Sequence, residues 1–463
     1  MEKKKHMDAA YAFSQFVAET QFEDLPREVV DVAKKSLLDT LGLGLGASTA
    51  EGIKGLYEMI SGWGGREEST VFGFGGKFPS VNAAMINSAM CHALEFDDTY
   101  WEAGLHPSCV AVPSAFAISE FVGSVDGKKF IAALSVATEM GCRIGKATKF
   151  RKNKGQIMAG WDDTAICGSF MAASMGKLLG FDKEMIHNAL GIAYTQAAGN
   201  AQGIREGVLT KRINPAFAAR GGLTAAFMAQ KGITGAKNIF EDGIASYYRV
   251  YHAGYNQKTL TEGLGKEFLM LGIDIKSYPC CLMSAAACEA AQKLSKEHHI
   301  KPEEVKEITA RVYPHAVTVC FPEETRQKPR SPEDAQFSLP WLVSCAMVRG
   351  NATLNEFTKE SIKDPDLLKM AAKVKGIIDP SFTSMEQTVM KIKTKRGAFK
   401  TTVFHPHGTT GNPMSLEDVA KKFWDCSSRS VKPIPDGNKR TVIDMVKDLE
   451  KVKDVAEIMR LLT

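Results

Sequence analysis

Cysteines with metal-binding spacing are missing from this 463-residue sequence, although it contains ten cysteines. No Cys-x-x-Cys motif occurs, and no two histidines have the helical spacing of a paired metal-binding motif. Structural zinc and iron–sulfur sites depend on such groupings of ligands. The sequence therefore predicts no metal site, and it predicts reduced thiols that are mostly buried.

Long hydrophobic runs are also missing. The least polar stretch, residues 103–119, includes His106 and Pro107 and is shorter than the ~20 apolar residues that a membrane-spanning helix needs. The densest basic run, Lys3 to Lys5, is not followed by the apolar segment of a signal peptide. We expect a cytoplasmic protein with no membrane partner.

Neither sign of charge dominates the chain. The 58 basic and 53 acidic residues leave a net charge of +5, and Lys and Arg are scattered rather than gathered into a stripe. This distribution argues against a nucleic-acid partner. Hydrophobic residues make up 44% and charged residues 24%, which is typical of soluble globular proteins, and the length is enough for two or three domains at roughly 150 residues each.

From residue 8 to about 265 the apolar residues recur with the period of an α-helix. In the helix that begins near Leu25, for example, Val29, Ala33, Leu37 and Leu41 share one face. Many of the segments are rich in Ala, Gly and Ser, which lets helix axes approach closely. Further helices are predicted over residues 81–94, 113–121, 129–148, 164–179, 183–198 and 215–230.

The pattern changes after about residue 268. Residues 308–313 and 389–394 alternate as half-buried strands do, and the second continues through Arg396 and Gly397 into 401–404 as a hairpin. Helices are predicted over 284–297 and 337–348, and a helical pattern resumes at Ser415. The predicted fold is therefore mostly α, with a discontinuous all-helical domain (1–268 and 406–463) and a smaller α+β domain (269–405).

Gly42, Gly44 and Gly46 invite comparison with a phosphate-binding loop. No strand precedes them and the Lys-Ser/Thr of a P-loop is missing. Because the segment continues an amphipathic helix, close helix packing is the favoured interpretation.

An acidic segment lies at the end of the helix predicted over 81–94. Glu95, Asp97 and Asp98 repel one another and need a cation, a metal ion or hydrogen-bond donors nearby, and His106 adds a group that titrates near neutral pH. These residues alone fit either a solvated helix end or a functional site.

Two other segments stand just before small-residue helices. Asp162, in Gly160 to Thr164, can be an N-cap, and Lys211 and Arg212 lie at a predicted helix entry where the helix dipole disfavours cations. Either an anion binds beside these two cations or they form a solvated pair.

Together these segments resemble the MmgE/PrpD family, which includes 2-methylcitrate dehydratase, cis-aconitate decarboxylase and iminodisuccinate epimerase. Their order and spacing identify the chain as a member over most of its length. The resemblance implies a large helical domain carrying a smaller α+β lid domain, a homodimer, and an active site between the domains without metal or organic cofactor. The matching segments are Leu38 to Gly42, His92 to Thr99, Gly160 to Thr164, Asn188 to Ala193, Lys211, Gln230 to Gly235, Tyr278 to Cys281, Ala335 to Ser338 and Gly411 to Ser415.

The family resemblance also implies roles for single residues. His106 matches a histidine that shuttles a proton at carbon, Thr99 a substrate-contacting threonine, and Lys211 a lysine that faces a substrate carboxylate. We expect Arg212 to assist Lys211.

Three positions depart from the family pattern. Glu95 replaces an Asp, which lengthens the arm, and Cys281 stands where the decarboxylase has a histidine. Asp162 replaces a histidine, and an ionised Asp at ~4 Å from a substrate carboxylate would repel it by about 1 to 4 kcal/mol. Asp162 is therefore an acid, a base, a partner for an amine, imine or hydroxyl of the substrate, or only a helix cap.

The resulting hypothesis is a cofactor-independent lyase or isomerase. It would transfer a proton at the carbon α to a carboxylate of a small polycarboxylate or amino-carboxylate, with His106, Lys211 and Asp162 catalytic and Glu95, Thr99, Arg212 and Cys281 binding substrate. The alternatives are a non-catalytic polycarboxylate-binding or scaffold protein and, less favoured, a metal hydrolase with Mg²⁺ on Asp97 and Asp98.

Overall fold

The structure is a computed structural model that describes residues 7–148, 160–241 and 243–463. The chain forms two compact units, residues 1–273 with 415–463, and residues 274–414. The basic run Lys3 to Lys5 lies outside the described residues.

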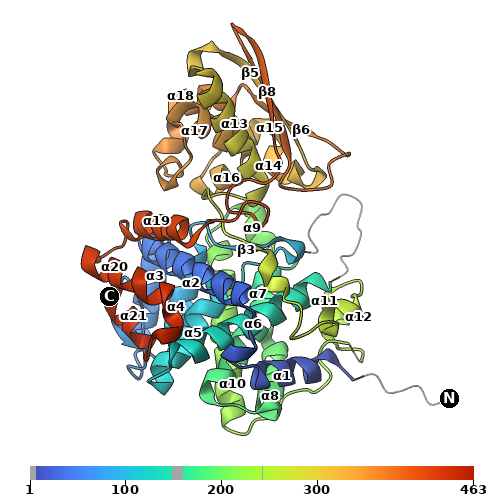
Figure 1. Cartoon of the computed structure of the whole chain (residues 1–463), viewed down its shortest axis with the longest axis vertical. Helices are drawn as coiled ribbons and strands as arrows, with labels where there is room; N and C mark the ends of the chain where they lie inside the picture. Colours follow the sequence, from blue (N-terminus) through green and yellow to red (C-terminus); the bar gives the residue numbers. More distant parts are fainter. Residues whose placement is uncertain (1–6, 149–159, 242) are drawn as a thin grey trace, which may run out of the picture. The chain divides into compact units, whose positions relative to one another are not determined.

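The first unit is built almost entirely of helices (Figure 1). Its α-helices are α1 (Ala9–Glu19), α2 (Arg27–Ala47), α3 (Ile53–Trp63), α4 (Ser80–His92), α5 (Ser108–Val122), α6 (Gly127–Lys146), α7 (Asp163–Ser174), α8 (Lys183–Gln196), α9 (Gln202–Glu206), α10 (Thr210–Gln230), α11 (Tyr247–Tyr251), α12 (Gln257–Thr261), α19 (Leu416–Ser427), α20 (Asp436–Lys447) and α21 (Ala456–Leu461). Short 3₁₀ helices are η1 (Phe22–Asp24), η2 (Trp101–Ala103), η3 (Met175–Leu179), η4 (Leu269–Gly272) and η10 (Leu449–Lys451), and two-residue strands are β1 (Ser69–Thr70), β2 (Lys77–Phe78) and β3 (Thr99–Tyr100).

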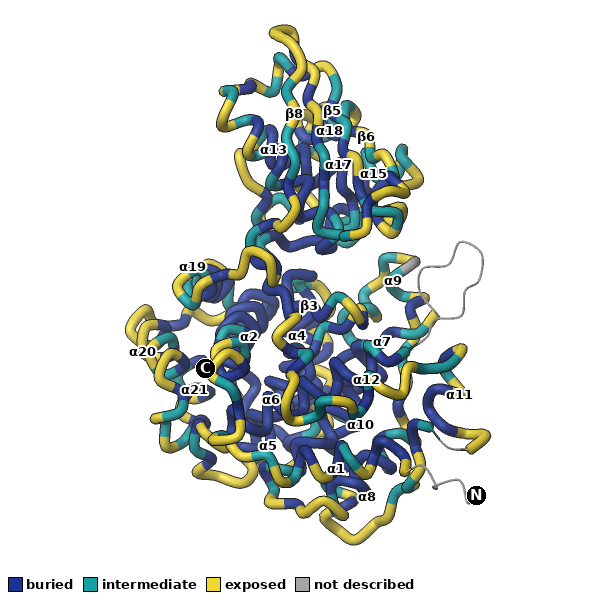
Figure 2. Tube along the Cα trace, turned by 45° about the vertical axis from the view of Figure 1, so that its right-hand side comes forward, coloured by how far each residue is buried: buried dark blue, intermediate teal, exposed yellow. Residues whose placement is uncertain are grey.

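Helix α10 lies at the centre of this unit, against α4, α7 and α8. Its buried face consists mainly of alanine and glycine, which brings neighbouring helices close. A Cβ at Gly168 of α7 would lie 3.1 Å from the Cβ of Ala218 on α10. Figure 2 shows the inner helices of the unit as continuously buried tubes. This close packing fixes the ends of α4, α7 and α10, where the candidate residues lie.

The glycines of α2 serve helix packing, as the sequence indicated. A Cβ at Gly42 would lie 2.7 Å from the Cα of Phe423, and one at Gly46 would lie 2.9 Å from the carbonyl oxygen of Cys426. Both contacts are with α19, so the C-terminal helices (red in Figure 1) pack beside α2 (blue). A phosphate-binding role for this segment has no support in the structure.

Gly42→Ala is expected to destabilise the protein by about 1–3 kcal/mol, because the added methyl group meets the backbone of α19. The matched control is Gly55→Ala in α3, where an added Cβ meets nothing within 4 Å. We expect that change to be neutral or to stabilise by up to ~1 kcal/mol. Urea unfolding of both variants measures the difference, and equal effects would contradict the packing role.

Lys422 of α19 ties the C-terminal segment to the middle of the unit. Its ammonium nitrogen lies 2.8 Å from Asp39 Oδ1 and donates to the carbonyl oxygen of Phe96 at 2.8 Å. Lys422 and Asp39 are both buried, so loss of either partner would leave an uncompensated buried charge. Phe96 belongs to the acidic segment, which α19 thereby supports.

The second unit contains a four-stranded mixed sheet in the order β6-β5-β7-β8. Its strands are β5 (Val305–Val312), β6 (Val374–Ile378), β7 (Thr388–Thr394) and β8 (Gly397–Val403), and β4 (Ile273–Asp274) spans the boundary between the units. Strand β5 pairs parallel to β6, with Ile308 opposite Val374, and antiparallel to β7, with Ile308 opposite Ile392. Alternating burial along β5 and β7 matches the period of a strand.

Helices α13 and α17 pack against this sheet and enclose the core around Trp341. The α-helices are α13 (Ala285–His298), α14 (Val317–Cys320), α15 (Glu323–Gln327), α16 (Pro332–Gln336), α17 (Leu339–Arg349) and α18 (Pro365–Ala371), with 3₁₀ helices η5 (Leu282–Ser284), η6 (Pro302–Glu304), η7 (Pro314–Ala316), η8 (Leu354–Glu356) and η9 (Ser361–Lys363).

The mostly α fold with a small mixed sheet in the C-terminal region is confirmed. Two predicted helix starts are wrong, because α5 begins at Ser108 rather than Pro113 and α10 at Thr210 rather than Pro215. Pro113 lies inside α5 and has no N–H to donate to the helix. The residues before it are fully buried, and their packing outweighs the loss of that hydrogen bond. Strand β6 and the two-residue strands, too short for a pattern, were not predicted.

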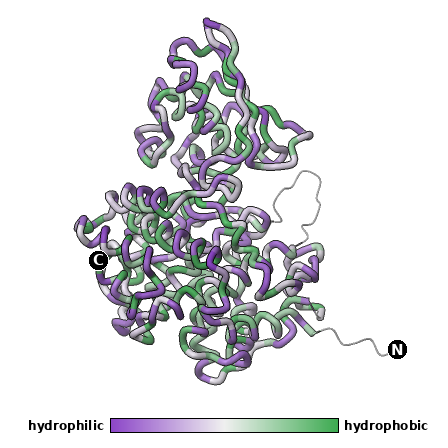
Figure 3. Tube along the Cα trace, viewed as in Figure 1, coloured by the Kyte–Doolittle hydropathy of each residue, from purple (hydrophilic) through white to green (hydrophobic). Residues whose placement is uncertain are grey.

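Hydrophilic and hydrophobic residues alternate along the helices of both units (Figure 3). Among the described residues, no helix combines the length and the apolar character needed to cross a bilayer.

Candidate functional site

The connection between α4 and α5, residues 93–107, carries three of the seven predicted site residues, Glu95, Thr99 and His106. Glu95 adopts φ +54°, the left-handed conformation that residues other than glycine rarely take, although it is buried. Backbone strain of this kind is held in place by its surroundings and is frequent at functional sites. The strain marks this connection as a candidate site on conformational grounds, independently of its acidic composition.

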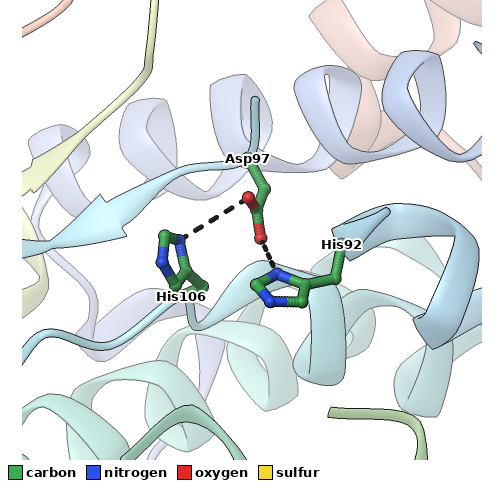
Figure 4. A group of neighbouring side chains, drawn as sticks. All are labelled: His92, Asp97 and His106. Atoms are coloured by element: carbon green, nitrogen blue, oxygen red, sulfur yellow. Dashed lines mark hydrogen bonds and ion pairs between the residues drawn. The ribbon is translucent and has the colours of Figure 1, made fainter. Parts of the chain in front are cut away.

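Asp97 lies between two histidines (Figure 4). Its Oδ2 is 2.6 Å from His92 Nδ1, and its Oδ1 is 3.6 Å from His106 Nδ1. The His92 and His106 rings are 5.1 Å apart between centroids, at an interplanar angle of 60°. A buried carboxylate therefore faces two imidazoles at once.

The hydrogen bonds of His106 define its tautomer. Its Nδ1 lies 2.8 Å from the carbonyl oxygen of Asp98 and 3.3 Å from Thr99 Oγ1. A carbonyl oxygen only accepts hydrogen bonds, so Nδ1 carries the hydrogen. In the neutral ring Nε2 then carries the lone pair, which is the state of a general base.

Asp98 is anchored to the first turn of α5. Its Oδ1 accepts from the Ser108 N–H at 3.2 Å, and its Oδ2 accepts from Ser108 Oγ at 2.6 Å. Burial raises the pKa of Asp98 to about 7. The two hydrogen bonds from Ser108 lower this pKa, but the effect of burial is larger. Asp98 therefore changes its charge near neutral pH, directly beside His106.

Lys211, in the first turn of α10, forms an ion pair with Glu95. Of the two alternatives for this helix entry, a bound anion or a solvated pair of cations, the structure shows an anion beside Lys211 that comes from the chain itself. Both side chains are largely buried, and each charge compensates the other. The pair joins the α4–α5 connection to α10.

Asp162 is the N-cap of α7. Its Oδ1 accepts from the Thr164 N–H at 3.1 Å, and its Oδ2 accepts from Asn214 Nδ2 at 2.9 Å. Thr164 Oγ1 in turn accepts from the His106 N–H at 3.1 Å. Asp162 therefore connects the start of α7 to α10 and, through Thr164, to His106.

These contacts form a closed ring within the first unit. Hydrogen bonds lead from His106 to Thr164, from Thr164 to Asp162 and from Asp162 to Asn214. One turn of α10 then leads to Lys211, which is paired with Glu95. Two residues further along the chain, Asp97 closes the ring on His106. Each step is an ion pair, a hydrogen bond or a short stretch of chain. We call it the site ring; it connects His106, Lys211, Asp162 and Glu95, and Thr99 contacts it through His106.

Replacement of Asp162 separates its capping role from a chemical one. Asn is as good an N-cap as Asp, whereas Ala loses about 1 kcal/mol. If Asp162 only caps α7, Asp162→Asn should keep both stability and turnover, and Asp162→Ala should lower the free energy of unfolding. A stable but inactive Asp162→Asn variant would instead indicate an acid or base, as measured by thermal unfolding and turnover in parallel.

Asp163 makes stability depend on pH. Burial, followed by the neighbouring Asp162, raises the pKa of Asp163 from 3.8 to about 8. A carboxyl group with a higher pKa in the folded protein stabilises the fold while it is protonated, and this contribution is lost as pH rises from about 4 through about 8. We expect Asp163→Asn to reduce the fall in Tm between about pH 5 and pH 9. An unchanged slope would contradict this assignment.

Two predicted substrate-binding residues lie outside the site ring. Arg212 donates to the carbonyl oxygen of Glu51 at 2.9 Å, and its neighbour Lys211 points elsewhere because successive helix residues are turned by about 100°. Cys281 belongs to the second unit, where it is buried and its N–H donates to the Gln336 carbonyl oxygen at 2.9 Å. The roles of Arg212 and Cys281 stay predictions.

Three residues of this site were not predicted from the sequence. Thr164 ends the segment Gly160 to Thr164, and Asn214 lies two residues after Arg212; polar residues at a helix N-terminus were a usable signal for both. His92 ends α4 and was treated as part of a helix terminus. Its five-residue separation from Asp97 gave no spacing signal, because the chain turns sharply at Glu95.

His92, Asp97 and His106 are also a possible metal-binding group, since their donor atoms lie within 4.8 Å of one another. Two ligands of a tetrahedral zinc ion, each about 2.0–2.1 Å from the metal, lie roughly 3.4 Å apart. His92 Nδ1 and Asp97 Oδ2 are 2.6 Å apart, which is a hydrogen-bond distance. The arrangement fits a shared proton better than a shared metal ion.

Comparison with known proteins gives two family matches. The model of the MmgE/PrpD N-terminal domain matches residues 11–259, and that of the MmgE/PrpD C-terminal domain matches residues 278–449. The second match extends over α19 and α20 of the first unit.

Three similar proteins are named cis-aconitate decarboxylase. The chain is 26% identical over 465 residues to a cis-aconitate decarboxylase from Aspergillus terreus, covering 95% of this chain and 93% of the relative. It is 26% identical over 459 residues to the cis-aconitate decarboxylase of Homo sapiens (95% and 91%) and 25% identical over 451 residues to that of Mus musculus (94% and 89%).

Proposed function

The chain belongs to the MmgE/PrpD family, and we propose that it is a lyase of the dehydratase and decarboxylase type acting on a small carboxylate. Similarity to cis-aconitate decarboxylases over nearly the whole chain supports this reaction class. The observation that carries the proposal is the site ring, which joins a buried cation and a histidine of defined tautomer. These two groups are what proton transfer next to a carboxylate needs.

Lys211 is the proposed carboxylate-binding group. When a proton or carbon dioxide leaves the carbon α to a carboxylate, the remaining electron pair delocalises onto that carboxylate, and a fixed cation stabilises the charge. An ammonium group has three N–H donors, so Lys211 can bind Glu95 and a substrate carboxylate together. In this proposal Glu95 keeps Lys211 charged and oriented while the site is buried.

His106 is the proposed group that moves the proton. With the hydrogen on Nδ1 held by the Asp98 carbonyl, Nε2 accepts a proton from the substrate carbon and returns it to carbon or to a departing hydroxyl group. In decarboxylation the carbon–carbon bond breaks, carbon dioxide leaves, and the imidazolium protonates the carbon. Thr99 holds the Nδ1 side of the ring and would also contact substrate.

Asp162 makes a tricarboxylate a less suitable substrate on this side of the site. An ionised carboxylate there repels a third substrate carboxylate but attracts an amine, imine or hydroxyl group. We therefore include amino-carboxylates and hydroxy-acids among the substrates, and epimerisation by reprotonation among the reactions. Cofactor independence, a homodimer and a cytoplasmic location stay predictions.

Proton exchange tests the proposal directly. Purified protein is incubated in deuterium oxide with citrate-like, aconitate-like and aspartate-derived acids, and NMR follows exchange of the α-hydrogen and formation of product. Exchange or product with any acid supports the enzyme. Thermal stabilisation by an acid without exchange or product would favour the non-catalytic binding protein instead.

A parallel series with a chelator tests the third hypothesis. The proposed steps use protein side chains, so activity should survive chelator treatment unchanged. Loss of activity that Mg²⁺ restores would favour a metal-dependent enzyme using Asp97 and Asp98.

A further inference from the structure

His92 and Asp97 have no role in the proposed chemistry, although both lie beside the imidazole of His106, the proposed base. Their side chains are almost completely buried. The Asp97 carboxylate accepts a hydrogen bond of 2.6 Å from His92 Nδ1 and lies 3.6 Å from His106 Nδ1, beyond hydrogen-bond distance. It therefore acts on His106 through its charge, while His92 holds its position.

The His92 ring contributes a second constraint. Its centroid is 5.1 Å from that of His106, and the rings meet at 60°. On its other side, His106 Nδ1 donates to the Asp98 carbonyl at 2.8 Å. The imidazole of His106 is thus held between a hydrogen bond and a ring contact, with a negative charge at its edge.

The other charged and titratable groups around Asp97 do not replace this charge. Burial raises the pKa of both Cys91 and Cys109 well above the ordinary value, so these thiols are neutral. Asp39 is paired with Lys422, and Glu95 with Lys211. Asp98, directly beside His106, titrates near neutral pH and must be controlled for in any experiment.

We propose that His92 and Asp97 are positioning residues that orient His106 and favour its protonated form, and that they thereby set the pH range in which it transfers protons. This inference rests on the proposed function for its catalytic meaning, but the arrangement itself can be tested without turnover. When His106 takes up a proton, Asp97 stabilises the imidazolium, as an opposite charge within ~4–6 Å does. His92 keeps Asp97 ionised and in place by donating to it.

Histidine titration in the full-length protein is the first test. The protein is labelled with ¹⁵N-histidine, and the signals of His92 and His106 are assigned by loss in His92→Gln and His106→Gln. In the wild type we expect His106 to carry its hydrogen on Nδ1. In Asp97→Asn we expect its titration midpoint to fall by about one pH unit or more, since a negative charge is removed.

Asp98→Asn is the matched comparison, because it changes the neighbouring charge but leaves Asp97 and its bond to His92. The change that Asp98→Asn causes in the titration midpoint of His106 measures how much the Asp98 charge contributes to that midpoint. A His106 midpoint that is unchanged in Asp97→Asn, or a hydrogen on Nε2 in the wild type, would overturn the proposal. The second of these results is measured on the wild-type protein, so it does not depend on the stability of Asp97→Asn.

The pH dependence of proton exchange is the second test. Asp97→Asn should move the acid limb of the rate profile to lower pH by about one unit and lower the plateau several-fold, because a weaker base works less well. His92→Gln keeps an amide donor for Asp97 and should retain at least half of the plateau rate, whereas His92→Ala should lose about tenfold or more. Equal losses in both His92 variants with an unshifted profile would indicate a merely structural role.

The two tests distinguish this inference from the proposed function. If the NMR midpoint shifts but no acid undergoes exchange, the positioning arrangement stands and the proposed reaction is wrong. If exchange occurs and neither the midpoint nor the rate profile moves, the reaction stands and the positioning role is wrong.

Discussion

Lys211→Ala is expected to lower turnover by about 10²- to 10³-fold while leaving the helical unit folded. A fixed charge that stabilises the developing negative charge typically contributes this much. Lys211 is the cation of the site ring, and its partner Glu95 is held in a strained backbone conformation. The result is read as kcat/KM for whichever acid exchanges or reacts, with circular dichroism to follow folding.

The loss of Lys211 also leaves Glu95 buried without its ion-pair partner, which is strongly destabilising by itself. The double variant Lys211→Ala with Glu95→Gln removes that charge and should regain stability without regaining turnover. Lys231→Ala, at the exposed C-cap of the same helix, is the matched control and should behave as wild type. Activity of Lys211→Ala above about a tenth of wild type, a barrier change below ~1.4 kcal/mol, would contradict the assignment.

His106→Ala is expected to slow exchange of the α-hydrogen by about 10²- to 10⁴-fold, the range over which a positioned acid or base acts. The affinity for a substrate carboxylate should change little, because Lys211 is the group proposed to bind it. Kinetic and binding measurements on the same variant separate these two effects. Addition of free imidazole should restore part of the exchange rate, since the deleted group is then supplied from solution.

His315→Gln is the control, because it removes an exposed imidazole of the second unit. It should change neither exchange nor stability. Exchange in His106→Ala at a rate close to wild type would show that another residue moves the proton. Asp162 would be the first residue to test for this role.

The secondary structure followed from local patterns wherever one face of an element is buried. Strand β7 alternates in burial as its sequence alternates, and it forms the predicted hairpin with β8, although the chain turns at Lys395 and Arg396 and Gly397 is already the first residue of β8. Strand β6 was missed because it is a short edge strand that pairs parallel to β5, a partner far away in sequence. Long-range pairing of this kind leaves no local signal.

The candidate residues of the first unit could be proposed from motifs, but their connections could not. Asp162 and Asn214 lie 52 positions apart, and Glu95 and Lys211 lie 116 apart. Only the packing of α4, α7 and α10 brings them together. The tautomer of His106 was equally inaccessible, because it depends on a backbone carbonyl whose direction follows from the fold.

The contact between α2 and α19 implies an order in which the two units complete their folding during synthesis. The second unit is continuous in sequence, so it can fold as soon as residue 414 has left the ribosome. The helical unit cannot be completed before α19 has been synthesised, since until then the glycine face of α2 lacks its packing partner. Lys422 of α19 bonds to Asp39 and to the carbonyl of Phe96. The segment that bears Glu95 and Asp97 therefore gains this support only once α19 is present, and a nascent chain that lacks α19 should be inactive.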